Sequence, residues 1–217
     1  MNREDFLNKA QEYVKQELGN DPSGHDWWHI YRVTQLAKKI AKEEKADEFI
    51  CETAALLHDL ADEKLAGSKE IGLMKVGSWL DENGIEQAVK ARVLEIIATM
   101  SYRGGSGSKM TSLEGMIVQD ADRLDAMGVI GIARTFVYAG WKGDLIYDPN
   151  LPYRNEMSIE SYRNERSTAI NHFHEKLLKL KDLINTDYAK KLAEERHERL
   201  EEFLRQFYRE WNADELE

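Results

Sequence analysis

Ionisable side chains interrupt apolar helical patterns at three places in this 217-residue sequence. His29 lies on a predicted apolar helical face, with apolar residues 4, 7 and 11 positions later, and His58 and Asp59 directly follow the apolar run 54–57. The third place is a segment between two apolar stretches that carries three acids: Asp120, Asp122 and Asp125. Burying an unpaired carboxylate is costly, so buried acids normally have an ionic partner or a metal.

One divalent cation, bound by two imidazoles and two carboxylates, would satisfy all three places. Such a mixed nitrogen and oxygen set suits Mn²⁺, Fe²⁺, Co²⁺, Ni²⁺ or Zn²⁺ better than Ca²⁺. His58 and Asp59 would also lie at the C-terminal end of their helix, where the helix dipole favours a cation. Each feature alone has an ordinary explanation, as a hydrogen-bonded core histidine or a solvated aspartate. The prediction therefore depends on their combination.

Helices must position these residues. The only prolines are at 22, 149 and 152, and the last glycine is Gly143, so long stretches lack helix breakers. Apolar residues recur at helical spacing along the chain, and no sustained period-two segment is present. We expect helix N-caps at Asp47, Ser68 and Thr186, and helical faces over 170–184 and 193–211. A capping box at 111–114 is expected to open one run from Met116 to Phe136. The predicted fold class is all-α.

We expect a single compact domain over 1–217. Its core would cover about 20–140, a loop would follow at 140–157, and helices at 158–213 would pack on the core. A second loop is expected at 101–110, where glycine and serine are abundant. The charged C-terminal helices could serve a partner or a homodimer interface.

Composition excludes several classes of protein. With 30 Lys and Arg against 40 Asp and Glu, the net charge of −10 argues against binding of a nucleic-acid polymer. No apolar run is long enough to span a membrane, and the first residues do not resemble a secretory signal. The single cysteine, Cys51, cannot form an intrachain disulfide. We therefore expect a cytoplasmic protein, which could still bind a small polyanion in a locally basic pocket.

The order and context of these motifs resemble the H…HD…D signature of the HD-domain metal-dependent phosphohydrolases. The matching segments are His29-x₃-Val33, His58-Asp59 and Ala121-Asp122-Arg123-Leu124. Segments 24–33, 118–126, 131–136 and 176–181 are similar to a bacterial branch of small helical nucleotide pyrophosphohydrolases, and the resemblance runs over about 20–211. It implies four metal ligands: His29, His58, Asp59 and Asp122.

The resemblance also bears on the number of metal ions. Many HD proteins that bind two ions carry further histidines between the doublet and the last aspartate, and residues 60–121 here contain none. We expect one divalent transition metal ion, Mn²⁺ before Co²⁺, Ni²⁺, Fe²⁺ or Zn²⁺. The departure argues against cyclic-dinucleotide phosphodiesterase chemistry.

Two candidate catalytic residues keep alternative interpretations. Asp62 occupies the place where related phosphohydrolases have an acid that orients or deprotonates water, but it could equally be a solvated acid at a helix end. His25 could join His29 on the metal through their H-x₃-H spacing. We favour the alternative in which Asp26 caps the helix and His25, just outside it, contacts the substrate or a metal ligand.

Asp125 stands one helical turn after Asp122. It could hydrogen-bond a ligand histidine and fix its tautomer. The alternative is an ion pair with Arg123 or another surface base.

The resemblance predicts that a nucleoside triphosphate is cleaved to monophosphate and pyrophosphate. Four cations are candidates to neutralise its phosphate chain: Arg103, Lys109, Arg123 and Lys142. The loop 103–109 lacks the spacing of a P-loop, so an ordinary solvated loop is its alternative interpretation. A phosphatase acting on nucleoside monophosphates at the same site, and a non-catalytic helical module that binds a nucleotide, are the rival functions.

Two groups of residues are expected to have structural roles only. The paired Trp27 and Trp28 are interpreted as packing residues. The histidines of the charged C-terminal segments are expected on the surface: His172, His174 and His197.

Overall fold

The computed structural model describes residues 2–19, 26–62, 66–100, 110–154 and 167–214. Its α-helices are α1 (Arg3–Leu18), α2 (Trp27–Glu44), α3 (Glu48–Leu57), α5 (Lys69–Glu82), α6 (Gln87–Thr99), α7 (Leu113–Asp125), α8 (Gly128–Lys142), α10 (Ala169–Glu175) and α11 (Asp187–Trp211). Short 3-10 helices are η1 (His58–Ala61), η2 (Leu177–Lys179) and η3 (Lys181–Leu183). Among these residues β pairing is limited to an isolated bridge between Leu145 and Thr168. The all-α prediction is confirmed.

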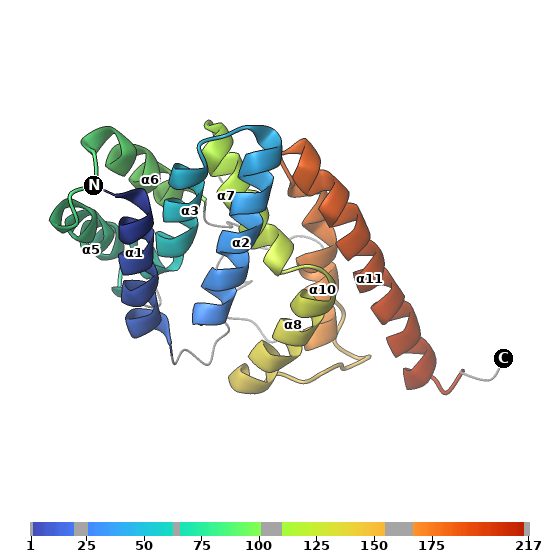
Figure 1. Ribbon diagram of the computed structural model, residues 1–217. Coiled ribbons are helices and arrows are strands. Elements are labelled where there is room, and N and C mark those ends of the chain that lie inside the picture. Colours follow the sequence, from blue (N-terminus) through green and yellow to red (C-terminus); the bar gives the residue numbers. More distant parts are fainter. Residues whose placement is uncertain (1, 20–25, 63–65, 101–109, 155–166, 215–217) are drawn as a thin grey trace.

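Helices α2, α3 and α7 pack against one another in the middle of the molecule. Helices α1, α5 and α6 flank them on one side, and α8, α10 and α11 lie on the other (Figure 1). The packed faces are the apolar stripes of the sequence, including the fully buried Ile30, Val33 and Ile117. Burying such side chains contributes about 1.5–3 kcal/mol each. None of the described helices is both long and apolar enough to cross a membrane.

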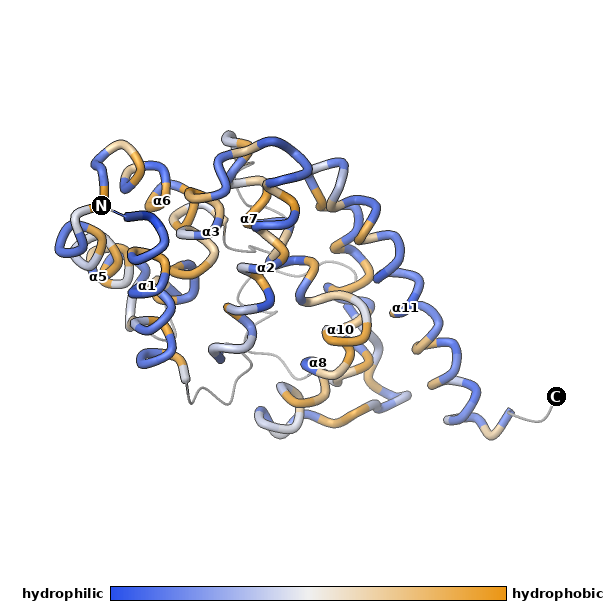
Figure 2. Tube along the Cα trace, in the orientation of Figure 1, coloured by the Kyte–Doolittle hydropathy of each residue, from blue (hydrophilic) through white to orange (hydrophobic). Residues whose placement is uncertain are grey.

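Local capping signals position several helix starts. The side chains of Asp26, Asp47 and Ser68 accept hydrogen bonds from the first-turn amides of α2, α3 and α5. The caps expected at Asp47 and Ser68 are therefore confirmed, as is that at Asp26. Figure 2 shows that α11 is hydrophilic along much of its length, which leaves a narrow apolar face that packs on α2, α7 and α8.

The capping box predicted at 111–114 is wrong by one residue. Ser112, not Thr111, caps α7, and its hydroxyl accepts from the Gly115 amide at 3.2 Å. The Glu114 carboxylate does not serve the helix start alone. It also accepts from Arg92 at 2.5 Å and from the amide of Asp47 at 3.2 Å, so it binds tertiary partners as well.

The single helix predicted from Met116 to Phe136 is broken in two. Helix α7 ends in tight turns, in which the amides of Ala126 and Met127 donate to carbonyls three residues earlier. Gly128 then has φ +67°, a left-handed conformation, and starts α8 in a new direction. A Cβ at this position would lie 3.0 Å from Cγ of Arg196, so both backbone and space favour glycine.

The apolar face predicted over 170–184 is buried, but it is not one helix. Helix α10 ends at Glu175, and η2 and η3 carry the chain onward. Asp120 explains the next turn: its fully buried carboxylate accepts from the amide and side chain of Asn185 and from the amide and hydroxyl of Thr186. The Thr186 side chain therefore anchors α11 to α7 and does not cap its own helix. Asp120 serves the fold.

A second buried carboxylate holds the segment after α8. Glu175 accepts from the Arg154 amide at 3.1 Å, from its guanidinium at 2.8 and 3.0 Å, and from the Ser167 hydroxyl at 3.0 Å. Burial alone would raise the pKa of Glu175, but these donors hold it below its ordinary value.

The left-handed conformation of Gly128 gives a stability prediction. We expect Gly128→Ala to lower the free energy of unfolding by about 1–2 kcal/mol, because a left-handed alanine is disfavoured. Gly140→Ala, inside α8 with open space around its Cβ, is the matched control and should raise stability by about 0.5–1 kcal/mol. Chemical unfolding of both variants measures the difference. Equal effects would show that the left-handed turn is not a constraint.

The Arg154–Glu175 pair predicts a dependence of stability on pH. Because the folded pKa of Glu175 is lowered, its contribution is present above the ordinary value of 4.5 and is lost as the pH falls below it. Glu175→Gln should destabilise the protein at pH 7 by about 1.5–3 kcal/mol, the range for charged hydrogen bonds. The gap between variant and wild type should narrow at pH values below about 4. Urea unfolding across this range tests it, and a constant gap would contradict it.

Candidate metal centre

Helices α2 and α3 bring two histidines and an aspartate together at the centre of the fold. His29 lies in the first turn of α2, and His58 and Asp59 lie where α3 tightens into η1. One ligand atom from each of the three residues lies within 4.8 Å of the others, and all three residues are buried. Nε2 of His29 is 3.4 Å from Oδ2 of Asp59, and Nε2 of His58 is 3.0 Å from Oδ1 of Asp59.

Asp122 of α7 adds a fourth side chain at the edge of this group. Its Oδ1 lies 3.5 Å from Nε2 of His29, and its side chain is 39% exposed. The structure therefore brings together all four side chains that the sequence predicted as ligands. The more open position of Asp122 gives this locality a side that faces solvent.

Hydrogen bonds on the far side of each imidazole determine which nitrogen faces the group. Nδ1 of His58 lies 2.8 Å from the carbonyl oxygen of Ala55, and Nδ1 of His29 lies 2.8 Å from Oδ2 of Asp125. Since both partners are acceptors, each Nδ1 carries a proton, which leaves Nε2 as the nitrogen that would bind a metal ion. Nε2 of His58 is buried and faces Oδ1 of Asp59. These donors fit a divalent transition metal ion.

The surrounding charges shift two pKa values in opposite directions. Burial alone would lower the pKa of His58, but the carboxylates of Asp59 and Asp122 outweigh it and raise the pKa to about 9. Burial would raise the pKa of Asp125, but His29, Arg32 and Arg134 hold it well below its usual range. The group thus attracts positive charge, and Asp125 remains a carboxylate.

Both interactions considered for Asp125 are present: it hydrogen-bonds His29, and it pairs with bases other than Arg123. Arg32 binds it through Nε at 2.6 Å and Nη2 at 3.1 Å, and Arg134 of α8 binds it through Nη1 at 2.6 Å. Sequence reasoning missed both arginines. Arg32 stands one turn after His29, a spacing that could have indicated it, whereas Arg134 reaches Asp125 only because the chain turns at Gly128.

The other predicted site residues have separate positions. Asp26 caps α2 through the amide of His29, and Asp62 ends η1, three residues after Asp59. Arg123 turns away and donates to the Leu183 carbonyl. Lys142 pairs with Asp144 at the end of α8, about 20 Å along the helix from Gly128. His25, Arg103 and Lys109 lie outside the described residues.

Two expectations about packing need correction. Trp28 is 61% exposed on α2, although it was expected to pack, while Trp27 is partly buried. The C-terminal histidines are partly buried rather than on the surface, because α10 and α11 pack on the core. Burial lowers the pKa of His172 to about 3, and His174 stacks on Tyr153 with ring centroids 4.5 Å apart.

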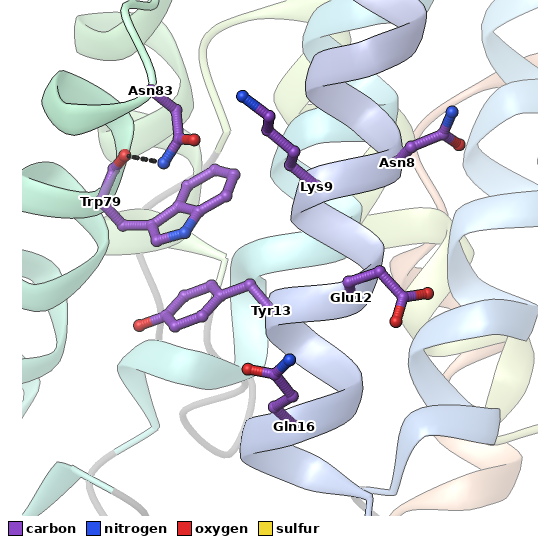
Figure 3. Close-up of a pocket in the computed structure, with 7 residues that line it drawn as sticks. All are labelled: Asn8, Lys9, Glu12, Tyr13, Gln16, Trp79 and Asn83. Atoms are coloured by element: carbon purple, nitrogen blue, oxygen red, sulfur yellow. Dashed lines mark hydrogen bonds between the residues drawn. The ribbon is translucent and has the colours of Figure 1, made fainter.

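A surface cavity between α1 and α5 lies apart from this group. Its volume is about 410 Å³, and Figure 3 shows the side chains of Tyr13 and Trp79 beside polar residues of α1. The two rings stack with centroids 5.2 Å apart. None of the residues that line it belongs to the histidine and aspartate group, so this cavity supplies no substrate space for a reaction there.

The HD-domain family model matches residues 27–127, a range that contains His29, His58, Asp59 and Asp122. The chain is 44% identical over 196 residues to the uncharacterized protein YpgQ of Bacillus subtilis, covering 89% of this chain and 88% of YpgQ. It belongs to the HD superfamily. The expectation of a metal-dependent phosphohydrolase of this superfamily is confirmed at that level.

Solved structures agree in fold. An HD-superfamily hydrolase from Bacillus thuringiensis is 48% identical, with a TM-score of 0.78 over 97% of this chain and 99% of that one. The structure of Bacillus subtilis YpgQ in complex with ADP is 41% identical, with a TM-score of 0.76 over 94% of this chain and 97% of that one.

The geometry gives a prediction for metal binding. His58→Gln and Asp59→Asn should each weaken Mn²⁺ binding about 100-fold or more, because each removes a donor from the group. Titration calorimetry on metal-stripped protein measures this. His197→Gln on α11, where His197 pairs with Glu201 at 3.3 Å, is the control and should bind Mn²⁺ like wild type. Unchanged affinity in both site variants, with folding intact, would refute the assignment.

Proposed function

We propose that this protein is a nucleotide pyrophosphohydrolase that cleaves (deoxy)nucleoside triphosphates to monophosphate and pyrophosphate. The observation that carries the proposal is the group of two imidazoles and two carboxylates, three of them buried, with both Nε2 atoms directed inward. Membership of the HD superfamily supports phosphate chemistry at such a group. The ADP complex of the related YpgQ supports a nucleotide with a phosphate chain as ligand.

His29, His58, Asp59 and Asp122 would hold one divalent ion, with Mn²⁺ our first choice. When bound, such an ion supplies a Lewis acid for a phosphate oxygen and lowers the pKa of a bound water. The chain's own contribution is orientation. Asp125 and the Ala55 carbonyl fix the two imidazoles so that both Nε2 atoms face the Asp59 carboxylate. This removes the need to reorganise ligands during turnover.

The proton and leaving-group steps need further residues. Water attacks the α-phosphorus, the bond from that phosphorus to the bridging oxygen breaks, and pyrophosphate leaves. Asp62, at the end of η1 next to the ligand doublet, is our candidate to orient the water and accept its proton. His25 is the second candidate for contact with the water or the substrate. The substrate is a free nucleotide, since a chain of net charge −10 is poorly suited to a nucleic-acid polymer.

The product distinguishes this proposal from its rivals. Metal-stripped protein should release pyrophosphate and nucleoside monophosphate in equal amounts from a panel of triphosphates, only after Mn²⁺ is added. Nucleoside monophosphates should release no phosphate. His58→Ala and Asp59→Ala should abolish turnover while the circular dichroism spectrum is retained. Phosphate release without pyrophosphate would instead identify a phosphatase, and nucleotide binding without any product would identify a binding module.

A further inference from the structure

Two arginines share one buried carboxylate directly behind His29. Arg32 binds both oxygens of Asp125, with Nε 2.6 Å from Oδ1 and Nη2 3.1 Å from Oδ2. This fork already neutralises the carboxylate. Arg134 adds a second guanidinium at 2.6 Å from Oδ2, and His29 donates to the same oxygen. Arg32 and Arg134, here called the arginine pair, therefore carry one positive charge more than Asp125 neutralises.

A third cation strengthens this excess. Arg196 of α11 donates to the Leu124 carbonyl, next to Asp125. Burial lowers the pKa of Arg196, and the Asp125 carboxylate is the largest of the charges that oppose this shift. Concentrating guanidinium groups is unfavourable unless anions offset them. In a protein with net charge −10, such a cluster is a local exception.

Both members of the arginine pair reach solvent. The side chain of Arg32 is 31% exposed and that of Arg134 is 24% exposed, whereas Asp125 is 2% exposed. A guanidinium has five N–H donors, so an arginine that binds a carboxylate through one or two of them can also bind a phosphate. The carboxylate then serves as a buried anchor that fixes the direction of both guanidiniums.

The arginine pair also lies next to the ligand group. Arg32 follows His29 by one turn of α2, and Asp125 contacts the nitrogen of His29 opposite the one that faces Asp59 and Asp122. Only the His29 ring and the Asp125 carboxylate lie between the arginine pair and the other metal-ligand candidates. Asp59 and Asp122 would balance the charge of a divalent ion. The negative charge of the phosphates of a nucleoside triphosphate would then need other cations.

We propose that Arg32 and Arg134 bind the phosphates that lie beyond the metal-bound one, which are the pyrophosphate portion of a nucleoside triphosphate. This inference rests on the proposed function. When the bond from the α-phosphorus to the bridging oxygen breaks, its electron pair stays on that oxygen as part of pyrophosphate. The guanidiniums offset this charge, and the proton from the attacking water passes to Asp62. A monophosphate has no group to place there, so the arginine pair selects for triphosphates.

Binding of inorganic pyrophosphate to the Mn²⁺-loaded protein tests the proposal without turnover. Arg32→Gln and Arg134→Gln should each weaken pyrophosphate binding about tenfold or more by calorimetry. Arg134→Lys should recover part of the loss, because it restores the charge without the fork. Mn²⁺ affinity, titrated alone, should stay within about threefold of wild type in Arg134→Gln. The matched control is Arg92→Gln, which removes an arginine paired with Glu114 of α7 and should leave pyrophosphate binding unchanged.

The outcomes separate this proposal from the proposed function. Unchanged pyrophosphate affinity in both variants would overturn the role of the arginine pair, even if wild type hydrolyses triphosphates. Equal losses of Mn²⁺ and pyrophosphate affinity would also overturn it, since the arginines would then only support Asp125. A wild type that binds pyrophosphate through the arginine pair but cleaves no triphosphate would support the pair and refute the proposed function.

Discussion

The central constraint is that two imidazoles and two carboxylates must face one small volume while the groups behind them remain satisfied. Each Nε2 can be directed inward only because each Nδ1 has an acceptor, the Ala55 carbonyl for His58 and the Asp125 carboxylate for His29. Asp125 in turn is buried and needs cations, which Arg32 and Arg134 provide. Ligand geometry in this protein therefore depends on a second layer of hydrogen bonds as much as on the ligands themselves.

The residues that meet this constraint lie at the ends of helices. His58 and Asp59 lie where α3 tightens into η1, and Asp122 and Asp125 lie in the last turn of α7. The left-handed Gly128 turns the chain so that α8 can return an arginine to the end of α7. Asp120, two residues before Asp122, anchors α11 to the same helix. Rigid helices thus carry the ligands, and the conformation at the helix ends determines which way the ligand side chains point.

Sequence reasoning succeeded where the determining interaction is local. Helical periodicity, the caps at Asp47 and Ser68, and the ionisable residues on apolar faces depend on neighbours within one or two turns, so the all-α fold and the locality of the four candidate ligands could be predicted. Tertiary contacts decided the failures. The Glu114 side chain binds Arg92, and the Thr186 hydroxyl donates to Asp120. The apolar face at 170–184 is divided among α10, η2 and η3. The spacing of Arg134 from Asp125 carries no local signal, so this arginine was missed.

Net charge describes the whole surface, whereas binding depends on the field at one place. A chain of charge −10 can bind a polyanion if its cations are gathered and its nearby acids are neutralised. Here Asp59 and Asp122 face the proposed metal, and Asp125 is enclosed by Arg32, Arg134 and His29, so none of the three is left to repel a phosphate chain. The same carboxylate orients a ligand histidine and fixes two guanidiniums. The proposed metal and phosphate sites therefore share Asp125 as a common buried anchor, with the ligand histidine on one side of it and the two guanidiniums on the other.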